Sequence, residues 1–254
     1  MLKLNAYQLK WLAIIGMFLN HAVYALSNII PLWLMIPMYA AGGLTFPIMG
    51  YFVVEGYRHT SNLKKYLLRL LIFGAIAIPF HHFVFNGAVL FNIMFTIIFS
   101  LLVLLMYDKI KSRVLFWILF VLLIPVTFLF DWWIIGVLVV LLYHIIPNET
   151  ARRIVPSIVS GVAFFVMSGF ALFGVMTLQG VDTPEAEEAL YYIIAMFGSL
   201  NIVYASLSFI IGCFFAAFLL KQYDGERGKP MKWLFYAFYP VHFIILTVLA
   251  IFLN

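Results

Sequence analysis

Residues 114–146 read VLFWILFVLLIPVTFLFDWWIIGVLVVLLYHII, and Asp131 is the only Asp, Glu, Lys or Arg among them. A helix needs about 20 mostly apolar residues to cross a bilayer, whereas a membrane strand would alternate apolar and polar residues. The same continuous pattern extends over the chain, which is 66% hydrophobic and 10% charged. Soluble domains are roughly 45–50% apolar and about 25% charged. The composition therefore excludes an ordinary soluble protein and a disordered one, and it predicts an all-α polytopic membrane bundle.

Charged residues divide the chain into nine apolar segments, which we expect to be nine transmembrane helices of a single membrane domain, residues 1–254. The segments are 11–27, 32–54, 66–84, 89–107, 114–130, 132–146, 154–178, 189–220 and 233–253. No small-residue cleavage motif follows the first segment, so we expect a retained span rather than a signal peptide. The fifth and sixth segments are short. They fit either a tight hairpin or a pair in which one member does not fully cross.

The basic residues predict the orientation of these spans. With nine spans and a cytoplasmic N-terminus, all 15 Lys and Arg fall on the cytoplasmic side, and the C-terminus lies outside. This agrees with the positive-inside rule. The agreement fails downstream if either short segment is not a span, which supports both segments as real spans without deciding whether each one crosses completely. The net charge of +5 then reflects cytoplasmic loops, and we expect no nucleic-acid binding.

Polar residues inside spans are costly and mark functional sites by default. His21 follows Lys10 by eleven residues, which on a helix is three turns plus about 20° and a rise of roughly 16 Å. Lys10 at the inner surface and His21 near mid-membrane therefore share one helix face. His21 is either a general base reached from the cytoplasm, because histidine titrates near neutrality, or a neutral buried side chain bonded to a neighbouring helix. His242 lies near mid-membrane in the last span, after Tyr239-Pro240.

A second polar group is expected on the outer side of the membrane. It comprises His81 and His82 at the end of the third span, Asn92 early in the fourth, and Asp131 between the fifth and sixth. Histidines and a carboxylate can bind zinc, but their spacing fits no metal motif, so we predict no metal. Interfacial residues without a function are the alternative reading.

Two inner segments combine basic residues with Gly, His, Thr and Tyr. They are 55–69, which begins EGYRHT, and 223–228, YDGERG. Cations beside hydroxyls and aromatic rings suit a phosphorylated cofactor, and the two glycines next to Arg227 indicate a tight turn near a ligand. Positive-inside anchoring alone is the competing explanation.

In this order, these groups resemble the TraX family of membrane acetyltransferases, whose best-known members acetylate the N-terminus of conjugative pilin. The resemblance runs from the first span to the last. It rests on Lys10 with Asn20-His21, FPI at 46–48, EGYRHTSN at 55–62, KYLLRL at 65–70, NIMFT at 92–96, Asp131 with Gly136, YDGERG at 223–228, FY at 235–236 and YPVH at 239–242. The chain is also similar to the broader class of multi-span acyltransferases, which place a basic residue and then a histidine on the first helix. The expected acid before this histidine is here Asn20, so Asp131 or another side chain has to orient His21.

The resemblance implies an enzyme of the bacterial cytoplasmic membrane that moves an acetyl group from cytosolic acetyl-CoA to an amine or hydroxyl. A pilin N-terminus is implied as acceptor by the resemblance alone, and the other expected partners are acyl-CoA and membrane lipids. The expected catalytic residues are His21 as general base, Asn20, Asn92 or Tyr239 as oxyanion donors, and Asp131 and His242. The expected donor-binding residues are Arg58, Lys65, Arg69 and Arg227 at the phosphates, His59 and Tyr223 near the adenine or ribose, and Lys10 at the tunnel mouth.

Two other function classes compete with the enzyme. A proton-coupled transporter of a small polar solute would use the same intramembrane histidines. A structural subunit of a conjugation or secretion complex would carry no chemistry, and it leaves the number of intramembrane histidines unexplained.

Overall fold

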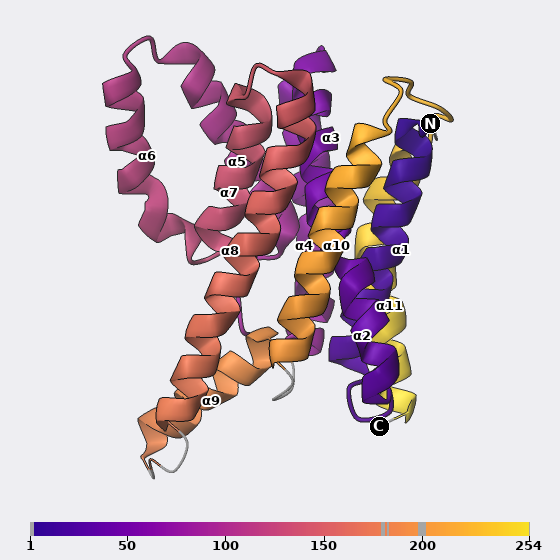
Figure 1. Ribbon diagram of the computed structural model, residues 1–254, viewed down its shortest axis with the longest axis vertical. Helices are drawn as coiled ribbons and strands as arrows, with labels where there is room; N and C mark the ends of the chain where they lie inside the picture. The colour runs from indigo at the N-terminus through magenta and orange to yellow at the C-terminus, as the bar shows by residue number, and fades with distance from the viewer. Residues whose placement is uncertain (1–2, 179–180, 182, 198–201, 254) are drawn as a thin grey trace.

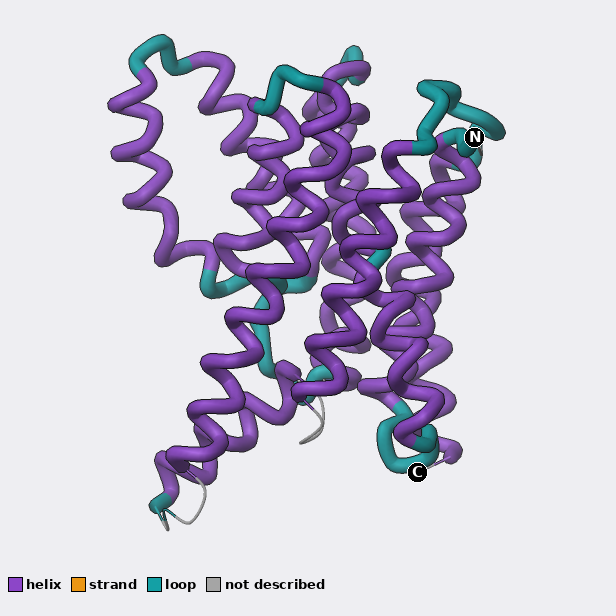
Figure 2. Tube along the Cα trace, in the orientation of Figure 1, coloured by secondary structure: helices purple, strands orange, loops and turns teal. Residues whose placement is uncertain are grey.

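A computed structural model describes residues 3–178, 181, 183–197 and 202–253, and nearly all of them are helical (Figure 1). The helices in these ranges are α1 (Ala6–Ala25), α2 (Leu32–Gly43), α3 (Thr45–His59), α4 (Leu63–Val84), α5 (Ile93–Lys109), α6 (Arg113–Thr127), α7 (Trp133–Ile145), α8 (Glu149–Leu178), α9 (Pro184–Phe197), α10 (Ile202–Lys221) and α11 (Lys232–Leu253). Side chains cap several of them at the N-terminus, namely Asn5, Asn62, Asn92 and Ser112. Figure 2 shows helices joined by loops, and the all-α prediction is confirmed.

The chain is a multi-pass membrane protein, but its helices do not all have the length of a span. Within the described ranges, five stretches are long and apolar enough to cross a bilayer: 32–59 (α2 with α3), α4, α8, 203–221 in α10, and α11. By contrast, α6 and α7 have 15 and 13 residues. At 1.5 Å per residue they extend about 22 and 20 Å, short of the roughly 30 Å hydrocarbon core. Neither helix alone is therefore long enough to cross the core, and the tight hairpin is the possibility that fits their lengths.

The eighth predicted span, 189–220, contains the end of α9 at Phe197 and the start of α10 at Ile202, and residues 198–201 between them lie outside the described ranges.

The turn between α6 and α7 lies at mid-height of the bundle (Figures 1 and 2). Its backbone pairs with the segment before α5: Phe91 N–H donates to the Leu129 carbonyl at 2.9 Å, and Asp131 N–H donates to the Phe91 carbonyl at 2.8 Å. Trp132 and Trp133 have φ angles of 63° and 39°, which cost energy in residues other than glycine and persist only where packing holds them. Non-helical backbone is tolerated at this depth when protein covers it. Asp131 is thus inside the bundle, and the prediction that it lies on the outer side is wrong.

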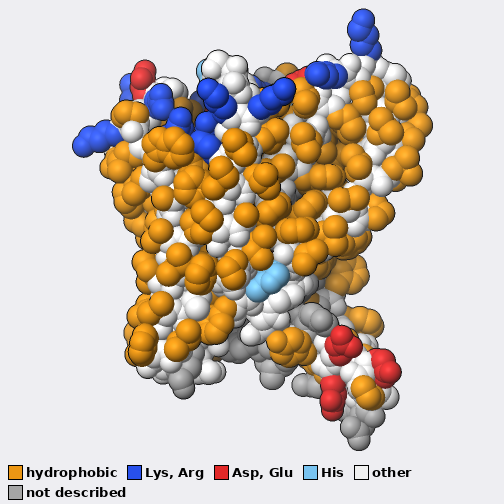
Figure 3. Space-filling model, turned by 180° about the vertical axis from the view of Figure 1, so that it is seen from behind, with side chains coloured by type: hydrophobic (Ala, Val, Ile, Leu, Met, Phe, Trp, Pro, Cys, Tyr) orange, Lys and Arg blue, Asp and Glu red, His pale blue; other side chains and the backbone are white. Residues whose placement is uncertain are grey.

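The basic residues gather at one end of the molecule, which we call the basic end. All 15 Lys and Arg lie at the N-terminus or within about two turns of the α3–α4, α5–α6, α7–α8 and α10–α11 connections. Figure 3 shows these side chains at the top of the molecule, and it shows acidic side chains on the part that projects at the opposite end. The chain starts at the basic end and α11 finishes at the other (Figure 1), as an odd number of crossings requires.

Glycine contacts hold α2, α10 and α8 together. A Cβ at Gly212 of α10 would lie 1.9 Å from the Ala40 carbonyl oxygen and 2.9 Å from the Cα of Gly43, both on α2. Gly161 of α8 makes a similar close approach to Cys213 of α10. Membrane helices associate through small residues that let backbones come close, so these glycines set the spacing of this part of the bundle.

Candidate active site

A cavity of about 950 Å³ opens at the basic end among α1, α3, α4, α5, α11 and the α10–α11 loop. Glu55 is the single carboxylate in its lining, against six cationic side chains. The cations are Lys10, Lys65, Arg69, Arg227, Lys229 and Lys232. Four tyrosines and two phenylalanines add aromatic surface: Tyr7, Tyr66, Tyr223, Tyr236, Phe52 and Phe235.

Most of the predicted donor-binding residues meet in this cavity. Those that line it are Lys10, His59, Lys65, Arg69, Tyr223 and Arg227. Arg58 does not line it, because its guanidinium turns toward α7, donates to the His144 carbonyl at 2.9 Å and lies 3.5 Å from Glu55. The sequence reasoning missed Lys229 and Lys232, which it treated only as topology signals. Their place in the same short loop as Arg227 was the signal that could have found them.

The six cavity cations have no acidic partner in the described part of the chain. In that part of the chain, the acids within 4 Å of a basic group pair with residues outside this set of six: Arg58, His59, His144, Arg152 and Arg153. Lys10 Nζ lies 4.9 Å from the centre of the Phe52 ring. The buried Nε of Arg69 has no hydrogen-bond partner among the described residues. Lys10 precedes the apolar segment 11–27, and burial together with the like charge of Arg227 lowers the pKa of Lys10 to about 8. The cavity therefore carries positive charge that an anion could neutralise.

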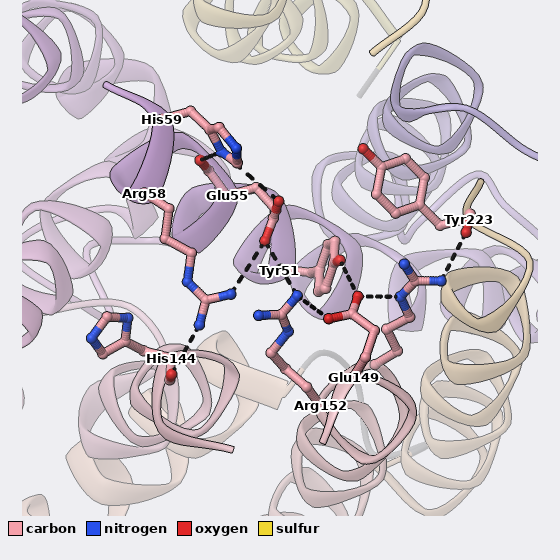
Figure 4. A network of polar contacts seen from close by, with 9 residues as sticks. Tyr51, Glu55, Arg58, His59, His144, Glu149, Arg152 and Tyr223 are labelled. Carbon is pink, nitrogen blue, oxygen red and sulfur yellow. Dashed lines mark hydrogen bonds and ion pairs between the residues drawn. The ribbon is translucent and has the colours of Figure 1, made fainter. Parts of the chain in front are cut away.

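The network in Figure 4 explains why the cavity's one acid does not neutralise it. Glu55 lies 3.5 Å from Arg58 and 3.6 Å from Arg152 of α8, so its charge is already shared by two cations outside the cavity lining. Next to it, Glu149 accepts from Arg153 Nε at 2.8 Å and from the Tyr51 hydroxyl at 3.2 Å. Glu55 of α3 and Glu149 of α8 are thus both paired with residues of these same two helices.

The same network positions the α10–α11 loop. Arg153 of α8 donates to the Tyr223 carbonyl at 2.8 Å, and Leu4 N–H donates to the Gln222 carbonyl at 3.0 Å. The tight turn predicted from the glycines is present, since Gly225 and Gly228 have φ angles of 87° and 67°. These bonds place the loop's cations over the cavity.

A histidine pair lies deeper in the bundle. Nδ1 of His21 on α1 is 2.7 Å from Nε2 of His242 on α11, and Nδ1 of His242 is 3.0 Å from the Phe238 carbonyl oxygen. A carbonyl only accepts, so Nδ1–H of His242 donates to it and leaves the Nε2 lone pair to accept from Nδ1–H of His21. In the neutral pair, the lone pair of His21 is therefore on Nε2, where a general base needs it. The neighbouring-helix partner of His21 is His242, rather than a carboxylate.

Tyr239 lies close to this pair. Its ring is 5.5 Å from that of His242 in an edge-on arrangement, and the residue is 2% exposed. No hydrogen bond joins Asp131 to His21 in the described part of the chain, where the partner of His21 is His242.

The two predicted asparagines have packing roles in this arrangement. Asn92 is fully buried, donates to the Gly74 carbonyl at 2.8 Å and accepts from Met94 N–H at 3.1 Å. It is thus inside the bundle. Asn20 packs on α2, where a Cβ at Gly42 would lie 2.5 Å from its Oδ1.

This fold and this site define a class: a multi-pass helical membrane protein with a cation-lined cavity at one end and a buried histidine pair beyond it. The chain belongs to the TraX family, whose model, described as TraX protein, matches residues 5–250. It is also similar to the probable fimbrial assembly protein FimC, serogroup H1, of Dichelobacter nodosus, with 29% identity over 266 residues that cover 98% of this chain and 97% of the relative. No solved structure matches it. The resemblance inferred from the ordered motifs is confirmed.

Proposed function

We propose that this chain is an integral membrane acetyltransferase that uses acetyl-CoA and transfers the acetyl group to an amine or hydroxyl. By the positive-inside rule the basic end faces the cytoplasm, and we place the protein in a bacterial cytoplasmic membrane. The observation that supports this most is the position of the cationic cavity relative to the histidine pair. Phe235 lines the cavity, and His242 follows it by seven residues on α11, a rise of about 10 Å.

The cavity suits the nucleotide part of the donor. Ligand pockets are typically about 300–1,000 Å³, and phosphates are bound by charge-assisted hydrogen bonds from Arg and Lys. Arg69, Arg227 and Lys65 would bind the phosphates, and a phosphate oxygen would satisfy the orphaned Nε of Arg69. His59 and Tyr223 would contact the adenine or ribose. Arg58 has no part in this proposal because it lies outside the lining.

The thioester has to pass the deep end of the cavity to reach the histidines, since neither His21 nor His242 lines it. Met49, Leu70 and Met94 are apolar residues of the cavity lining. Methionine side chains are unbranched and repack readily. We propose that these side chains move to admit the pantetheine arm.

At the reaction centre, Nε2 of His21 takes the proton from the acceptor as it attacks the thioester carbon, and returns that proton to the departing thiolate. His242 keeps His21 in the required tautomer and stabilises the imidazolium that forms. Tyr239, whose ring packs edge-on against His242, would modulate the charge on this pair.

The acceptor is proposed from the family and from the relative's name. The chain belongs to the TraX family, for which the motif resemblance implies a pilin acceptor, and the relative is named as a probable fimbrial assembly protein. We therefore propose the N-terminal amine of a pilin or fimbrial subunit as the first acceptor to test.

The donor site can be tested by thermal stabilisation in detergent. Ligand at 100 times its Kd stabilises a protein by about 2.7 kcal/mol, so CoA and acetyl-CoA should raise the Tm. Arg69→Ala should weaken CoA binding by about 10–100-fold, because a hydrogen bond to a charged group contributes roughly 1.5–3 kcal/mol. Arg113→Ala is the matched control, since Arg113 stacks on Tyr107 at 3.9 Å outside the cavity.

An equal Tm shift in Arg69→Ala and wild type would contradict the donor site. No shift with either ligand, together with proton-coupled uptake into vesicles, would favour the transporter.

The pKa of Lys10 predicts how CoA affinity depends on pH. Between about pH 7, above the second pKa of a phosphate monoester, and pH 8, the free Lys10 is already charged, so binding the anion requires no proton uptake and affinity stays level. Above that pH, binding must protonate Lys10, and affinity falls by up to about tenfold per pH unit. Lys10→Arg keeps its charge throughout this range and should give a level profile to about pH 9.5. A level profile in the wild type would show that Lys10 does not contact the anion.

A further inference from the structure

His81 of α4 is buried without a partner. It is 1% exposed, and neither of its ring nitrogens has a hydrogen-bond partner among the described residues. A neutral imidazole always carries one N–H and one lone pair, so a donor and an acceptor are both left unsatisfied, which destabilises the fold. A leucine would avoid that penalty. Each unsatisfied buried group calls for an explanation. One explanation is a hydrogen-bond partner that is present only while a substrate is bound.

His81 and His21 face the same aromatic space. Phe85 lies 4.8 Å from the His81 ring and 5.4 Å from the His21 ring. Phe243 lies 5.4 Å from His81 and 4.7 Å from His21. Both histidine rings therefore share the same two phenylalanine neighbours, which places His81 and His21 around one buried region of the bundle.

The neighbouring His82, at the same end of α4, does have a hydrogen-bond partner. Its Nε2 lies 2.8 Å from the Leu90 carbonyl, and its side chain is partly exposed. The adjacent imidazole is thus satisfied, and it provides a matched control.

Two of the expected oxyanion donors are already engaged: Asn92 uses its Oδ1 and one amide hydrogen within the fold, and Asn20 packs against α2. The Tyr239 hydroxyl is also buried without a partner among the described residues, but its ring packs against His242 and Phe243, whereas His81 shares both of its phenylalanine neighbours with His21. Acetyl transfer places negative charge on the carbonyl oxygen, and a preorganised N–H aimed at that oxygen is a major source of rate enhancement.

We propose that His81 is a further catalytic residue whose ring N–H donates to the acetyl carbonyl oxygen during transfer. This rests on the proposed function. The acceptor nitrogen or oxygen bonds to the carbonyl carbon while its proton passes to Nε2 of His21. The carbonyl π electrons move onto the oxygen, which the His81 N–H stabilises. The carbonyl then re-forms, the C–S bond breaks, and the thiolate takes the proton from His21.

The variant His81→Leu should separate stability from activity. We expect its Tm without ligand to equal or exceed that of the wild type, because two unsatisfied polar atoms are removed. We expect kcat to fall by about 10²–10³-fold, with KM for acetyl-CoA unchanged. His81→Gln keeps an N–H donor and should be at least tenfold faster than His81→Leu. His82→Gln should keep wild-type kcat.

A spectroscopic readout needs no turnover. In His21→Ala, the thioester carbonyl stretch of bound ¹³C-acetyl-CoA should lie below its value in water-free solvent, and His81→Leu in the same background should restore it. An unshifted stretch in His21→Ala overturns the proposal even if His81→Leu does not fold. So does a folded His81→Leu within twofold of wild-type kcat, or equal losses in His81→Gln and His81→Leu. Wild-type protein that neither binds CoA nor transfers acetyl defeats the proposed function itself, which keeps the two failures distinct.

Discussion

Replacing His21 by alanine is expected to lower kcat for acetyl transfer by about 10²–10⁴-fold. The reason is that the lone pair on its Nε2 is the base that the hydrogen-bond chain from Phe238 through His242 prepares. CoA binding should be unchanged, because His21 lies outside the cavity lining. Transfer from labelled acetyl-CoA, with the Tm shift by CoA measured on the same samples, checks both parts.

The dependence of His21 on His242 gives this prediction a second arm. His242→Phe keeps a ring against Phe238 and Phe243 but removes the acceptor for His21 Nδ1–H, so kcat should fall by about tenfold or more. Residues that act as a unit are non-additive. The double variant should therefore be no slower than His21→Ala alone. Full turnover in a normally folded His21→Ala would show that the site assignment is wrong.

Gly212→Val is expected to have the largest effect on the fold. A Cβ at this position would lie 1.9 Å from the Ala40 carbonyl oxygen, which is helix backbone and cannot rotate away. Helices α2 and α10 would have to separate, at a cost of about 3 kcal/mol or more. Thermal unfolding in detergent should show a clear fall in Tm.

Gly169→Ala of α8 is the control for helix propensity. Nothing lies within 4 Å of a Cβ built there, and alanine favours a helix over glycine by roughly 1 kcal/mol. Its Tm should stay level or rise. A Gly212→Val protein with the Tm of the wild type would show that α2 and α10 do not pack as described.

Local features of the sequence were enough to predict the helices and the basic end. Continuous apolar segments such as 154–178 can satisfy their backbone inside a membrane only as helices. Lys65, Arg69 and Arg227 follow from local clustering next to span ends. The charge pattern could not settle whether α6 and α7 cross, however. A hairpin that turns back at mid-depth leaves its flanking segments on the same side as two complete spans do.

Compensation of charge at the cavity depended on contacts between distant residues. Arg58 and Arg69 look equivalent in the sequence, yet Arg58 points to His144 and Glu55 while Arg69 lines the cavity. Glu55 is held by Arg152, which comes from another helix. Which cations remain free for an anion is therefore a property of helix packing.

The histidine pair shows most clearly which features follow from the sequence and which depend on helix packing. The spacing from the basic ends of their helices predicts that His21 and His242 lie deep in the bundle, because rise per residue is a local property of a helix. Their 2.7 Å contact joins residues 221 positions apart, and it exists because α1 packs against α11. The tautomer that leaves Nε2 of His21 free follows from that contact, so only the tertiary structure could decide it.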